Sequence, residues 1–143
     1  MKVSEIMTSD FEMIDSTHSL TAAAQKMKSL NVGFLPVQEG TRLIGLITDR
    51  DIVVRALAEG LDPDMTQAKD IISSELVFCY EDDSIEDAAR LMEDNQVRRL
   101  IVCDRDRTPV GIVSLGDIAA KTGDERLAGE ILERVSEPAA PVR

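Results

Sequence analysis

Two short segments of the chain repeat one pattern of residue types. Each runs from a glycine through two aliphatic residues to a hydroxyl residue, and an aspartate stands three positions further on: Thr48 and Asp51 in one segment, Ser114 and Asp117 in the other. A hydroxyl can donate a hydrogen bond to a phosphate, and a carboxylate can accept from the two hydroxyls of a ribose. If a strand runs into a helix at each segment, the free backbone amides of the helix start would attract an anion as well.

The same pattern also fits a structural role. A hydroxyl residue at a helix N-cap and an acidic residue three positions later can form a capping box, in which each side chain binds the backbone N–H of the other residue. One pair of side chains can cap a helix and face a ligand at the same time. Both interpretations therefore stay open for Thr48 with Asp51 and for Ser114 with Asp117.

The two segments belong to a tandem duplication. Residues 4–57 align with residues 69–123 at an offset of 65, which becomes 66 after one extra residue near Thr108 and Pro109. Matching residues run along the whole alignment: Ile6 with Ile71, Ser19 with Ser84, Met27 with Met92, Val37 with Val102, Gly45 with Gly111 and Asp51 with Asp117. A repeat of this density determines the architecture before any single motif is weighed.

Each copy predicts the element order β-α-β-β-α. Apolar residues at helical spacing behind Ser19 and behind Ser84 predict an amphipathic helix in each copy. Short apolar runs around polar turns predict strands, and a second helix in each copy ends at a glycine, Gly60 or Gly123. The predicted strands are 11–14, 33–37, 43–48, 77–80, 100–103 and 110–114, and the predicted second helices are 49–59 and 116–122. We therefore expect an α/β fold, α+β in detail, with two β-α-β-β-α repeats packed in pseudo-twofold symmetry.

The duplication divides the chain into four parts. Repeat 1 covers residues 1–60, a connector covers 61–67, repeat 2 covers 68–123, and residues 124–143 form a C-terminal helix and tail. The apolar spacing before residue 136 is that of a short amphipathic helix. This helix could lie on its own core or cover a partner subunit, and packing within the chain is the more common use.

Composition narrows the function classes. The chain has 143 residues and a formal net charge of −11, which argues against nucleic acid or an anionic membrane as a partner. The lone His18 is expected in a turn, and Cys79 and Cys103 in strand packing, because none of them is spaced as a metal ligand or beside a catalytic base. We expect no metal and no enzymatic activity. Without a signal-peptide or membrane-spanning apolar stretch, we expect a cytoplasmic protein.

The duplicated unit resembles the CBS domain. The resemblance rests on the β-α-β-β-α order and on a closing motif of glycine, two hydrophobic residues, Thr or Ser, two variable residues, Asp and Ile, as in Gly45–Ile52 and Gly111–Ile118. Two units in tandem resemble a CBS pair, or Bateman module, over about residues 3–122. The run Val97–Val102 followed by Gly111–Asp117 is similar to adenylate-sensing members, and the whole chain looks like the small stand-alone two-CBS proteins of the hypoxic response type.

The resemblance implies a cleft between the two copies with two symmetry-related nucleotide sites. By the family's pattern, the aspartate of the closing motif would hold the ribose diol, and the Thr or Ser would contact ribose or phosphate. One implied site comprises Ser114, Asp117, Arg98 and Arg99, closed by Met7, Thr8, Val32 and Gly33. The other comprises Thr48, Asp51, Gly33 and Phe34, closed by Ile72, Ser73, Val97 and Arg98.

The two implied sites differ in charge. Where the second copy has Arg98 and Arg99, the first has Gly33 and Phe34. Because guanidinium groups are natural phosphate ligands, we expect the site of the second copy to bind a phosphorylated adenosine more tightly. An inward turn of Arg50 or Arg98 would strengthen the site of the first copy. The alternative role for the arginine pair is a surface or intersubunit salt bridge with the abundant acids.

Two function classes follow from the resemblance. The leading expectation is a non-enzymatic regulatory or sensor module that binds an adenosine-containing ligand, with AMP, ADP, ATP, NAD and S-adenosylmethionine all within the family's range. The alternative is a constitutive dimerisation or adaptor protein with empty or vestigial pockets. In both cases we expect a homodimer, no required cofactor, and a separate, unidentified regulated protein.

Overall fold

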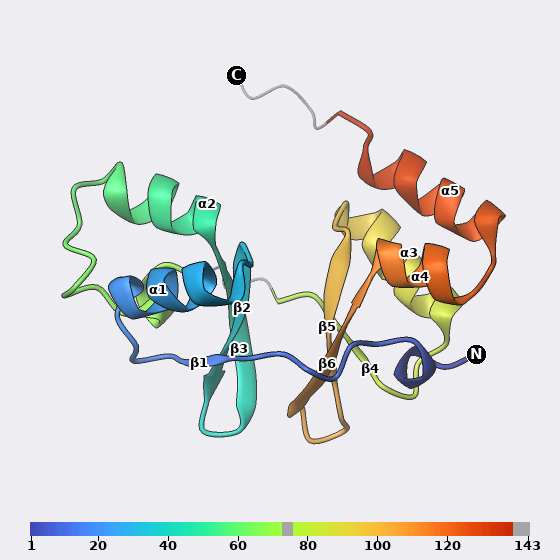
Figure 1. Ribbon diagram of the computed structural model, residues 1–143, viewed down its shortest axis with the longest axis horizontal. Helices are drawn as coiled ribbons and strands as arrows, with labels where there is room; N and C mark the ends of the chain where they lie inside the picture. The colour runs from blue at the N-terminus through green and yellow to red at the C-terminus, as the bar shows by residue number, and fades with distance from the viewer. Residues whose placement is uncertain (73–75, 139–143) are drawn as a thin grey trace. The chain divides into compact units, whose positions relative to one another are not determined.

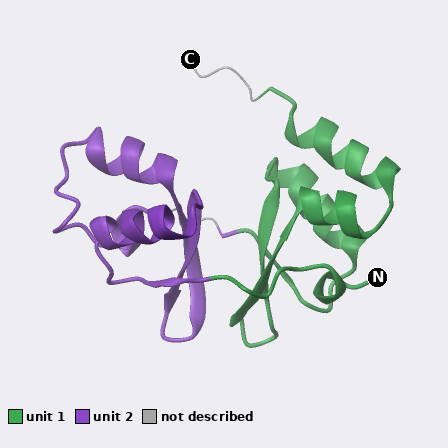
Figure 2. Ribbon diagram, in the orientation of Figure 1, with its two compact units in different colours: residues 1–11, 77–143 green, residues 12–76 purple. Residues whose placement is uncertain are grey.

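The computed structural model describes residues 1–72 and 76–138. The chain divides into two compact units (Figure 2): unit 2 holds residues 12–76, and unit 1 holds residues 1–11 together with residues 77–143. The structural division therefore crosses the repeats of the sequence. The first 11 residues belong to the unit built on the second repeat, and residues 68–72, which begin the second repeat, belong to the unit built on the first.

Unit 2 contains a three-stranded sheet and the helical segments around it. In chain order these are β1 (Ile14–Asp15), α1 (Leu20–Leu30), β2 (Phe34–Glu39), β3 (Arg42–Thr48), α2 (Asp49–Asp51), the π-helix η2 (Ile52–Leu57) and the 3-10 helix η3 (Ala68–Asp70). The strand order is β1-β2-β3, with β1 parallel and β3 antiparallel to β2. Helix α1 is the crossover that the parallel pair requires.

Unit 1 repeats this plan and adds a helix. Its elements are η1 (Val3–Glu5), β4 (Phe78–Tyr80), α3 (Ile85–Asn95), β5 (Arg99–Cys103), β6 (Pro109–Ser114), α4 (Leu115–Lys121) and α5 (Glu125–Val135). The strand order is β4-β5-β6, again with one parallel and one antiparallel pair. Helix α5 lies against α3 and α4 (Figure 1), so the C-terminal helix packs on its own chain.

Local sequence determines where the long helices begin and end. Ser19 and Ser84 are the N-caps, and each side chain accepts from the backbone N–H three residues on at 3.1 Å. Asn31 and Gln96 end the two helices in the left-handed conformation, with φ of 55° and 52°. Both helices therefore start and stop at equivalent positions of the repeat.

The predicted elements are confirmed with small shifts. Five of the six predicted strands lie within two residues of their predicted bounds. The prediction for residues 11–14 was wrong at its start, because the strand is confined to Ile14–Asp15. Gly60 and Gly123 follow the second helices with φ of 74° and 71°, as predicted. The fold class, α/β with two β-α-β-β-α repeats, is confirmed.

Each unit has its own cluster of buried apolar side chains. In unit 2, α1 packs on the sheet through Leu20, Ala23 and Met27 against Leu35, Val37 and Ile47. In unit 1, α3 packs on the equivalent sheet through Ile85, Ala88, Ala89 and Met92 against Leu100, Val102 and Val113. Ile131 of α5 is fully buried in the unit 1 cluster, which makes this helix part of the core.

Candidate functional site

The two predicted segments fold into the same strand-to-helix junction. In unit 2, Oγ1 of Thr48 accepts from the N–H of Asp51 at 3.0 Å, and the Asp51 carboxylate accepts from the N–H of Thr48 at 3.0 Å. In unit 1, Ser114 and Asp117 make the same two bonds at 3.0 and 2.9 Å. The capping box considered from the sequence is therefore present in both copies.

The capping bonds leave part of each side chain available. They use only Oδ2 of Asp51 and Asp117, whose side chains keep 22% and 15% of their surface exposed. An ionised carboxylate has about four lone-pair sites, and a hydroxyl that accepts a bond keeps its own hydrogen for donation. Each pair can therefore cap its helix and still offer acceptor positions and a hydroxyl donor to a ligand.

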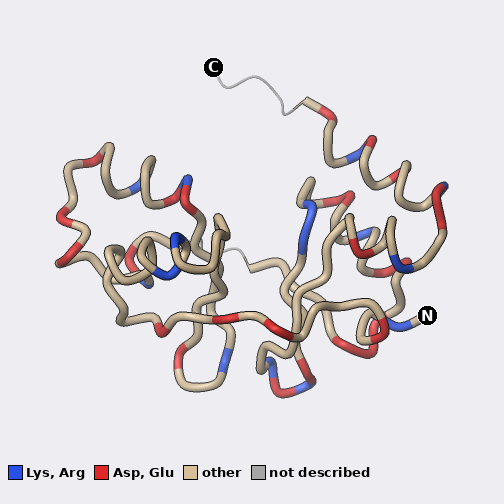
Figure 3. Tube along the Cα trace, viewed as in Figure 1, with Lys and Arg blue, Asp and Glu red and all other residues tan. Residues whose placement is uncertain are grey.

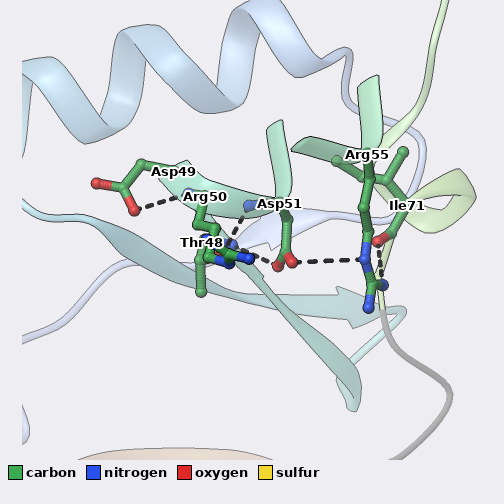
Figure 4. A network of polar contacts seen from close by, with 6 residues as sticks. All are labelled: Thr48, Asp49, Arg50, Asp51, Arg55 and Ile71. Atoms are coloured by element: carbon green, nitrogen blue, oxygen red, sulfur yellow. Dashed lines mark hydrogen bonds and ion pairs between the residues drawn. The ribbon is translucent and has the colours of Figure 1, made fainter. Parts of the chain in front are cut away.

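Arg55 links the Asp51 carboxylate to a distant segment of unit 2. Its Nε lies 3.8 Å from Oδ1 of Asp51, and its guanidinium donates to the carbonyl of Ile71 at 3.0 Å. Figure 4 shows the guanidinium between these two partners. Ile71 is the C-cap of η3, so the arginine holds the η3 segment beside the junction.

Lys121 makes the equivalent link in unit 1. Its Nζ lies 3.1 Å from Oδ1 of Asp117 and donates to the carbonyl of Ile6, at the end of η1, at 3.0 Å. Sequence analysis missed both basic residues as part of the site. The signal was present, because a basic residue follows the aspartate by four positions in each copy, Arg55 in the first and Lys121 in the second.

Two glycines let the leading segments, residues 1–11 in unit 1 and 68–72 in unit 2, approach the closing strands β6 and β3. In unit 1, Thr8 exchanges two backbone hydrogen bonds with β6, at 2.8 and 2.9 Å. A Cβ on Gly111 would lie 2.6 Å from Sδ of Met7, so a side chain at this position would force Met7 to move. In unit 2, a Cβ on Gly45 would lie 2.7 Å from Cδ1 of Ile72. Met7 and Ile72 therefore lie at equivalent places beside the closing strands of their units.

The residues before β2 and β5 lie against the starts of the second helices. In unit 2, the N–H of Asp49 donates to the carbonyl of Gly33 at 2.9 Å, and the Asp49 carboxylate covers the glycine so closely that a Cβ would lie 2.9 Å from its Oδ2. In unit 1, the N–H of Leu115 donates to the carbonyl of Arg98 at 2.8 Å. The residue that donates this bond is an aspartate in unit 2 and a leucine in unit 1, and the residue that accepts it is a glycine in unit 2 and an arginine in unit 1.

The two junctions consequently differ in charge. The charged residues at the unit 2 junction are two acids and two bases: Asp49, Asp51, Arg50 and Arg55. Those at the unit 1 junction are three bases and one acid: Arg98, Arg99, Lys121 and Asp117. Acidic positions are spread over both units, and a run of basic residues leads into β5 (Figure 3). The unit 1 junction therefore carries the more positive charge.

Most of the residues predicted for each site lie in the same unit as the aspartate of that site. Unit 1 contains Met7, Thr8, Val97, Arg98, Arg99, Ser114 and Asp117. Unit 2 contains Val32, Gly33, Phe34, Thr48, Arg50, Asp51 and Ile72. Phe34 pairs with Thr48 and Arg99 pairs with Ser114 across the strands. Ser73 lies outside the described residues, and the combination of residues from both units in one site stays a prediction.

The remaining candidate residues are accounted for by local structure. His18 accepts from the N–H of Asp15 at 3.3 Å, as expected of a turn residue. Cys79 and Cys103 are buried free thiols, and burial raises their pKa values to about 12 and about 11. Within residues 1–72 and 76–138, no group of three or more His, Cys, Asp or Glu could hold a metal ion. The same residues include no helix long and apolar enough to cross a membrane.

Two β-α-β-β-α repeats, each closing through a Thr-Asp or Ser-Asp cap, define a tandem CBS-domain protein. The CBS domain model matches residues 3–57 and 68–122. The chain therefore belongs to the CBS domain family, and the resemblance seen in the sequence is confirmed.

Relatives with the same two-domain organisation cover most of the chain. The chain is 39% identical over 134 residues to the CBS domain-containing protein YhcV of Bacillus subtilis, and the alignment covers 94% of each protein. It is 39% identical over 116 residues to Hypoxic response protein 1 of Mycobacterium tuberculosis, with 80% of each protein covered. The expected similarity to the stand-alone two-CBS proteins of this type is thus confirmed, and neither relative carries the name of an enzyme.

Solved structures of relatives have the same fold. The crystal structure of Hypoxic Response Protein I, which holds two coordinated zinc ions, matches with a TM-score of 0.77 at 37% identity, over 83% of this chain and 97% of that one. The CBS domain pair of protein MJ0100, in complex with 5′-methylthioadenosine and S-adenosylmethionine, matches with a TM-score of 0.71 at 27% identity, over 86% and 96%. A CBS pair similar to this chain therefore binds adenosyl ligands.

Proposed function

We propose that this CBS pair is a non-enzymatic regulatory module that binds an adenosine-containing ligand. The observation that carries the proposal is the hydroxyl–aspartate pair, which has the same geometry in both copies and keeps acceptor positions free of capping bonds. The adenosyl ligands of the MJ0100 domain pair support this class of ligand. AMP, ADP, ATP and NAD are the ligands we favour, with S-adenosylmethionine as a further member of the class.

The proposal assigns a role to each part of a junction. Asp51 and Asp117 would accept from the two hydroxyls of the ribose, and Thr48 and Ser114 would donate to ribose or phosphate. Arg55 and Lys121 would hold the aspartates in place without contacting the ligand. Arg55 also binds the carbonyl of Ile71, and Lys121 that of Ile6, so each basic residue would position a leading segment together with its aspartate.

The unit 1 junction would bind a phosphorylated adenosine more tightly than the unit 2 junction. Arg99 pairs with Ser114 across the strands and Arg98 precedes it, so the unit 1 junction carries two arginines where unit 2 has Gly33 and Phe34. In unit 2 the carboxylate of Asp49 occupies the space against Gly33 and would repel a phosphate. Arg50 is exposed and could compensate only in part.

Thermal denaturation with AMP, ADP, ATP, NAD and S-adenosylmethionine would test the class of ligand. A ligand that binds the folded chain raises the melting temperature by mass action. The proposal expects a rise with at least one of these ligands that grows with concentration. No rise with any of them at millimolar concentration would contradict it and favour the adaptor function.

Calorimetric titration of AMP into two variants would test the order of the sites. Asp117→Asn and Asp51→Asn keep an oxygen that can accept the capping bond but remove the charge. We expect about a tenfold loss of affinity for Asp117→Asn, since a hydrogen bond to a charged group contributes about 1.5–3 kcal/mol, and a smaller loss for Asp51→Asn. Asp106→Asn, in an exposed turn of unit 1, is the matched control. A larger loss for Asp51→Asn would reverse the proposed order.

The second candidate function is a constitutive dimerisation or adaptor protein. The observation that favours it is a set of exposed large apolar side chains in unit 2, which includes Val53, Leu57 and Met65. Soluble proteins expose few such groups together unless another molecule covers them. A homodimer belongs to both candidate functions, and sedimentation velocity would show it as a species of twice the chain mass. In the leading proposal, the module regulates a separate protein that is not identified.

A further inference from the structure

A pocket lies in unit 1 between helix α3 and strand β4, which is an edge strand of its sheet. Its volume is about 450 Å³, which is within the usual range of small-molecule sites. Every residue that lines it belongs to unit 1. The pocket is therefore complete within one unit, and none of its lining residues belongs to the hydroxyl–aspartate junctions.

The lining of the pocket is apolar in the middle and acidic along the helix on both sides. Phe78 and Tyr80 of β4 form one wall, and their rings meet edge to face with centroids 5.4 Å apart. Leu91 of α3 belongs to the other wall. Asp87 precedes Leu91 by four residues and Asp94 follows it by three, so the three residues share one face of the helix. The two aspartates are about 10 Å apart along the helix axis.

The equivalent place in unit 2 holds an ammonium group of the chain itself. At the repeat offset of 65, Lys26 corresponds to Leu91. Met13, just before β1, corresponds to Phe78. Nζ of Lys26 donates to the carbonyl of Met13 at 3.1 Å and lies 3.7 Å from the carboxylate of Glu12. A cation on an aliphatic stem therefore fits between the first helix and the edge strand of a repeat.

Unit 1 keeps the carbonyl acceptor and has leucine in place of the lysine. The N–H of Tyr80 donates to the Asp83 carboxylate at 2.8 Å, so it points away from β5. Because the backbone groups of alternate strand residues point the same way, the carbonyl of Phe78 also faces the open edge. Leu91 has no hydrogen to donate to this carbonyl. An ammonium group there would have to come from a ligand.

The pocket also carries acids that unit 2 lacks. Three aspartates line it, and the residues at their places in unit 2 are not acidic: Asp83, Asp87 and Asp94 against His18, Ala22 and Ser29. Carboxylates beside an apolar wall favour a cation with an aliphatic chain. The sequence differences between the units therefore all favour a cationic ligand in unit 1.

Two arginines line the pocket, and each is already paired with an aspartate. Arg90 lies 3.3 Å from Asp87, and Arg105 lies 2.8 Å from Asp82. Both arginine side chains are about two-thirds exposed, at 68% and 66%, so these ion pairs contribute little and a second cation can compete for the carboxylates. Cζ of Arg105 also lies 4.3 Å from the centroid of the Tyr80 ring, so the aromatic wall already accepts a cation.

We propose that the pocket between α3 and β4 binds a linear aliphatic polyamine. One terminal ammonium group would lie near Asp87 and the other near Asp94, with the alkyl chain over Leu91 and the aromatic rings. The carbonyl of Phe78 would accept from a nitrogen between the two ends. Spermidine has this arrangement of charges along an aliphatic chain.

Proton NMR of the full chain, titrated with spermidine, would test the proposal. Tyr80 is the single tyrosine, so its ring signals report the pocket. They should shift saturably, with half-saturation below about 1 mM, a value typical of a small ligand with few contacts. Butylamine has one ammonium group and should bind about tenfold more weakly or worse. Magnesium ions should leave the ring signals unchanged, because they have no aliphatic chain to cover the apolar wall.

Substitutions in α3 would locate the bound spermidine. Leu91→Lys supplies the ammonium group that Lys26 supplies in unit 2 and should abolish the shift, whereas Leu91→Met keeps an apolar side chain and should preserve it. Asp94→Asn should weaken binding about threefold in low salt and less in high salt. Glu86→Gln removes the same charge from an exposed position of α3 outside the pocket and should bind as the original chain does.

The melting-temperature shift with AMP should be the same in all four variants, which separates this proposal from the proposed function. Three results would overturn the proposal. One is the absence of any shift of the Tyr80 signals at millimolar spermidine. Another is a shift that Leu91→Lys and Asp94→Asn both leave unchanged, which would place spermidine elsewhere on the acidic surface. The third is equal affinity for butylamine and spermidine, which would make this a site for a single ammonium group such as a lysine side chain of another protein.

Discussion

The helical faces of the two units have the same origin and different surroundings. In unit 1 the second helix, α4, is short and ends at Gly123, after which the chain returns as α5 and covers the face. In unit 2 the second helix continues through the π-helical turns of η2, and the chain leaves along an exposed connector. The duplication thus preserved the sheet and its caps, while the segment after each second helix determined whether the face is buried or open.

The two strand-to-helix junctions show a second difference of the same kind. The capping boxes and their basic partners are equivalent in both units. The residue at the first position of the following helix is Asp49 in one unit and Leu115 in the other, next to Gly33 and Arg98 respectively. The framework is therefore shared, and the charge offered to a ligand is specific to each unit.

The largest loss in the free energy of unfolding should come from shortening a buried side chain of α5, the helix that covers the face of unit 1. Ile131→Ala removes a fully buried side chain from unit 1 and should lower the free energy of unfolding by about 2–5 kcal/mol, since it leaves a cavity in a packed core. Leu57→Ala removes an exposed side chain from unit 2 and should cost less than about 0.5 kcal/mol. Hydrogen exchange of the β5 and β2 amides at increasing urea concentration would follow the unfolding of unit 1 and unit 2 separately. Equal losses in the two variants would show that the face of unit 2 is covered in solution.

The thiols should make unit 1 sensitive to alkali. Cys79 and Cys103 have pKa values raised by burial to about 12 and about 11 from an ordinary value near 9, and Ile14 and Gln38 stand at their places in unit 2. Folded thiols hold their protons more tightly than unfolded ones, so the stabilisation is complete below pH 9 and is lost as pH rises from 9 towards 12.

At pH 10 this loss should amount to about 1 kcal/mol for each thiol. Urea denaturation at several pH values between 8 and 11 would measure it, with hydrogen exchange of β2 and β5 amides to separate the units. In Cys79→Ala the decline should be shallower than in the original chain. Identical slopes in the two proteins would remove the thiols as its cause.

The charge difference between the junctions can be reduced by one substitution. Asp49→Asn removes the carboxylate beside Gly33 and should raise the affinity of the unit 2 junction for AMP about threefold at low salt, because a charge near the surface contributes about 1 kcal/mol or less. Glu39→Gln, at the far end of β2, is the control of equal charge and should have little effect. Calorimetry in an Asp117→Asn background would isolate this junction, and unchanged affinity would mean that Asp49 does not face the phosphate.

The order of elements was accessible from the sequence because it depends on local signals. Serine caps, helical spacing and turn residues each act over a few positions, and the repeat doubled every signal. The capping role of Thr48 with Asp51 was accessible for the same reason, since it depends on three neighbouring residues.

Contacts between segments far apart in the sequence were not accessible in this way. Lys121 donates to the carbonyl of Ile6 across 115 positions, and no local pattern marks a carbonyl as an acceptor. The segment of residues 1–11 joins unit 1 through backbone bonds such as Val3 N–H to Asp83. Backbone bonds carry no residue preference that a sequence pattern could reveal. The π-helical form of η2 and the choice of face for α5 likewise depend on packing.

The smallest difference in stability between the units should come from the basic residues that pair with the aspartates. Lys121→Met removes a 3.1 Å ion pair with Asp117 and a 3.0 Å bond to the Ile6 carbonyl, and should cost about 0.5 kcal/mol. Arg55→Met removes a longer ion pair of 3.8 Å and should cost a few tenths of a kcal/mol, at about the lower limit for exposed pairs. Both side chains are about half exposed, at 45% and 49%, so water can replace much of what is lost.

Hydrogen exchange would measure these small effects more sharply than global denaturation. Each bond reaches a short 3-10 helix whose own bonds are few, so Lys121→Met should speed exchange of the Ile6 amide, and Arg55→Met that of the Ile71 amide. The effect should stay within the unit that carries the substitution, because both partners of each bond lie in that unit. Faster exchange at Ile71 in Lys121→Met would show instead that the two leading segments are coupled. The two junctions would then act as one cooperative site and not as independent ones.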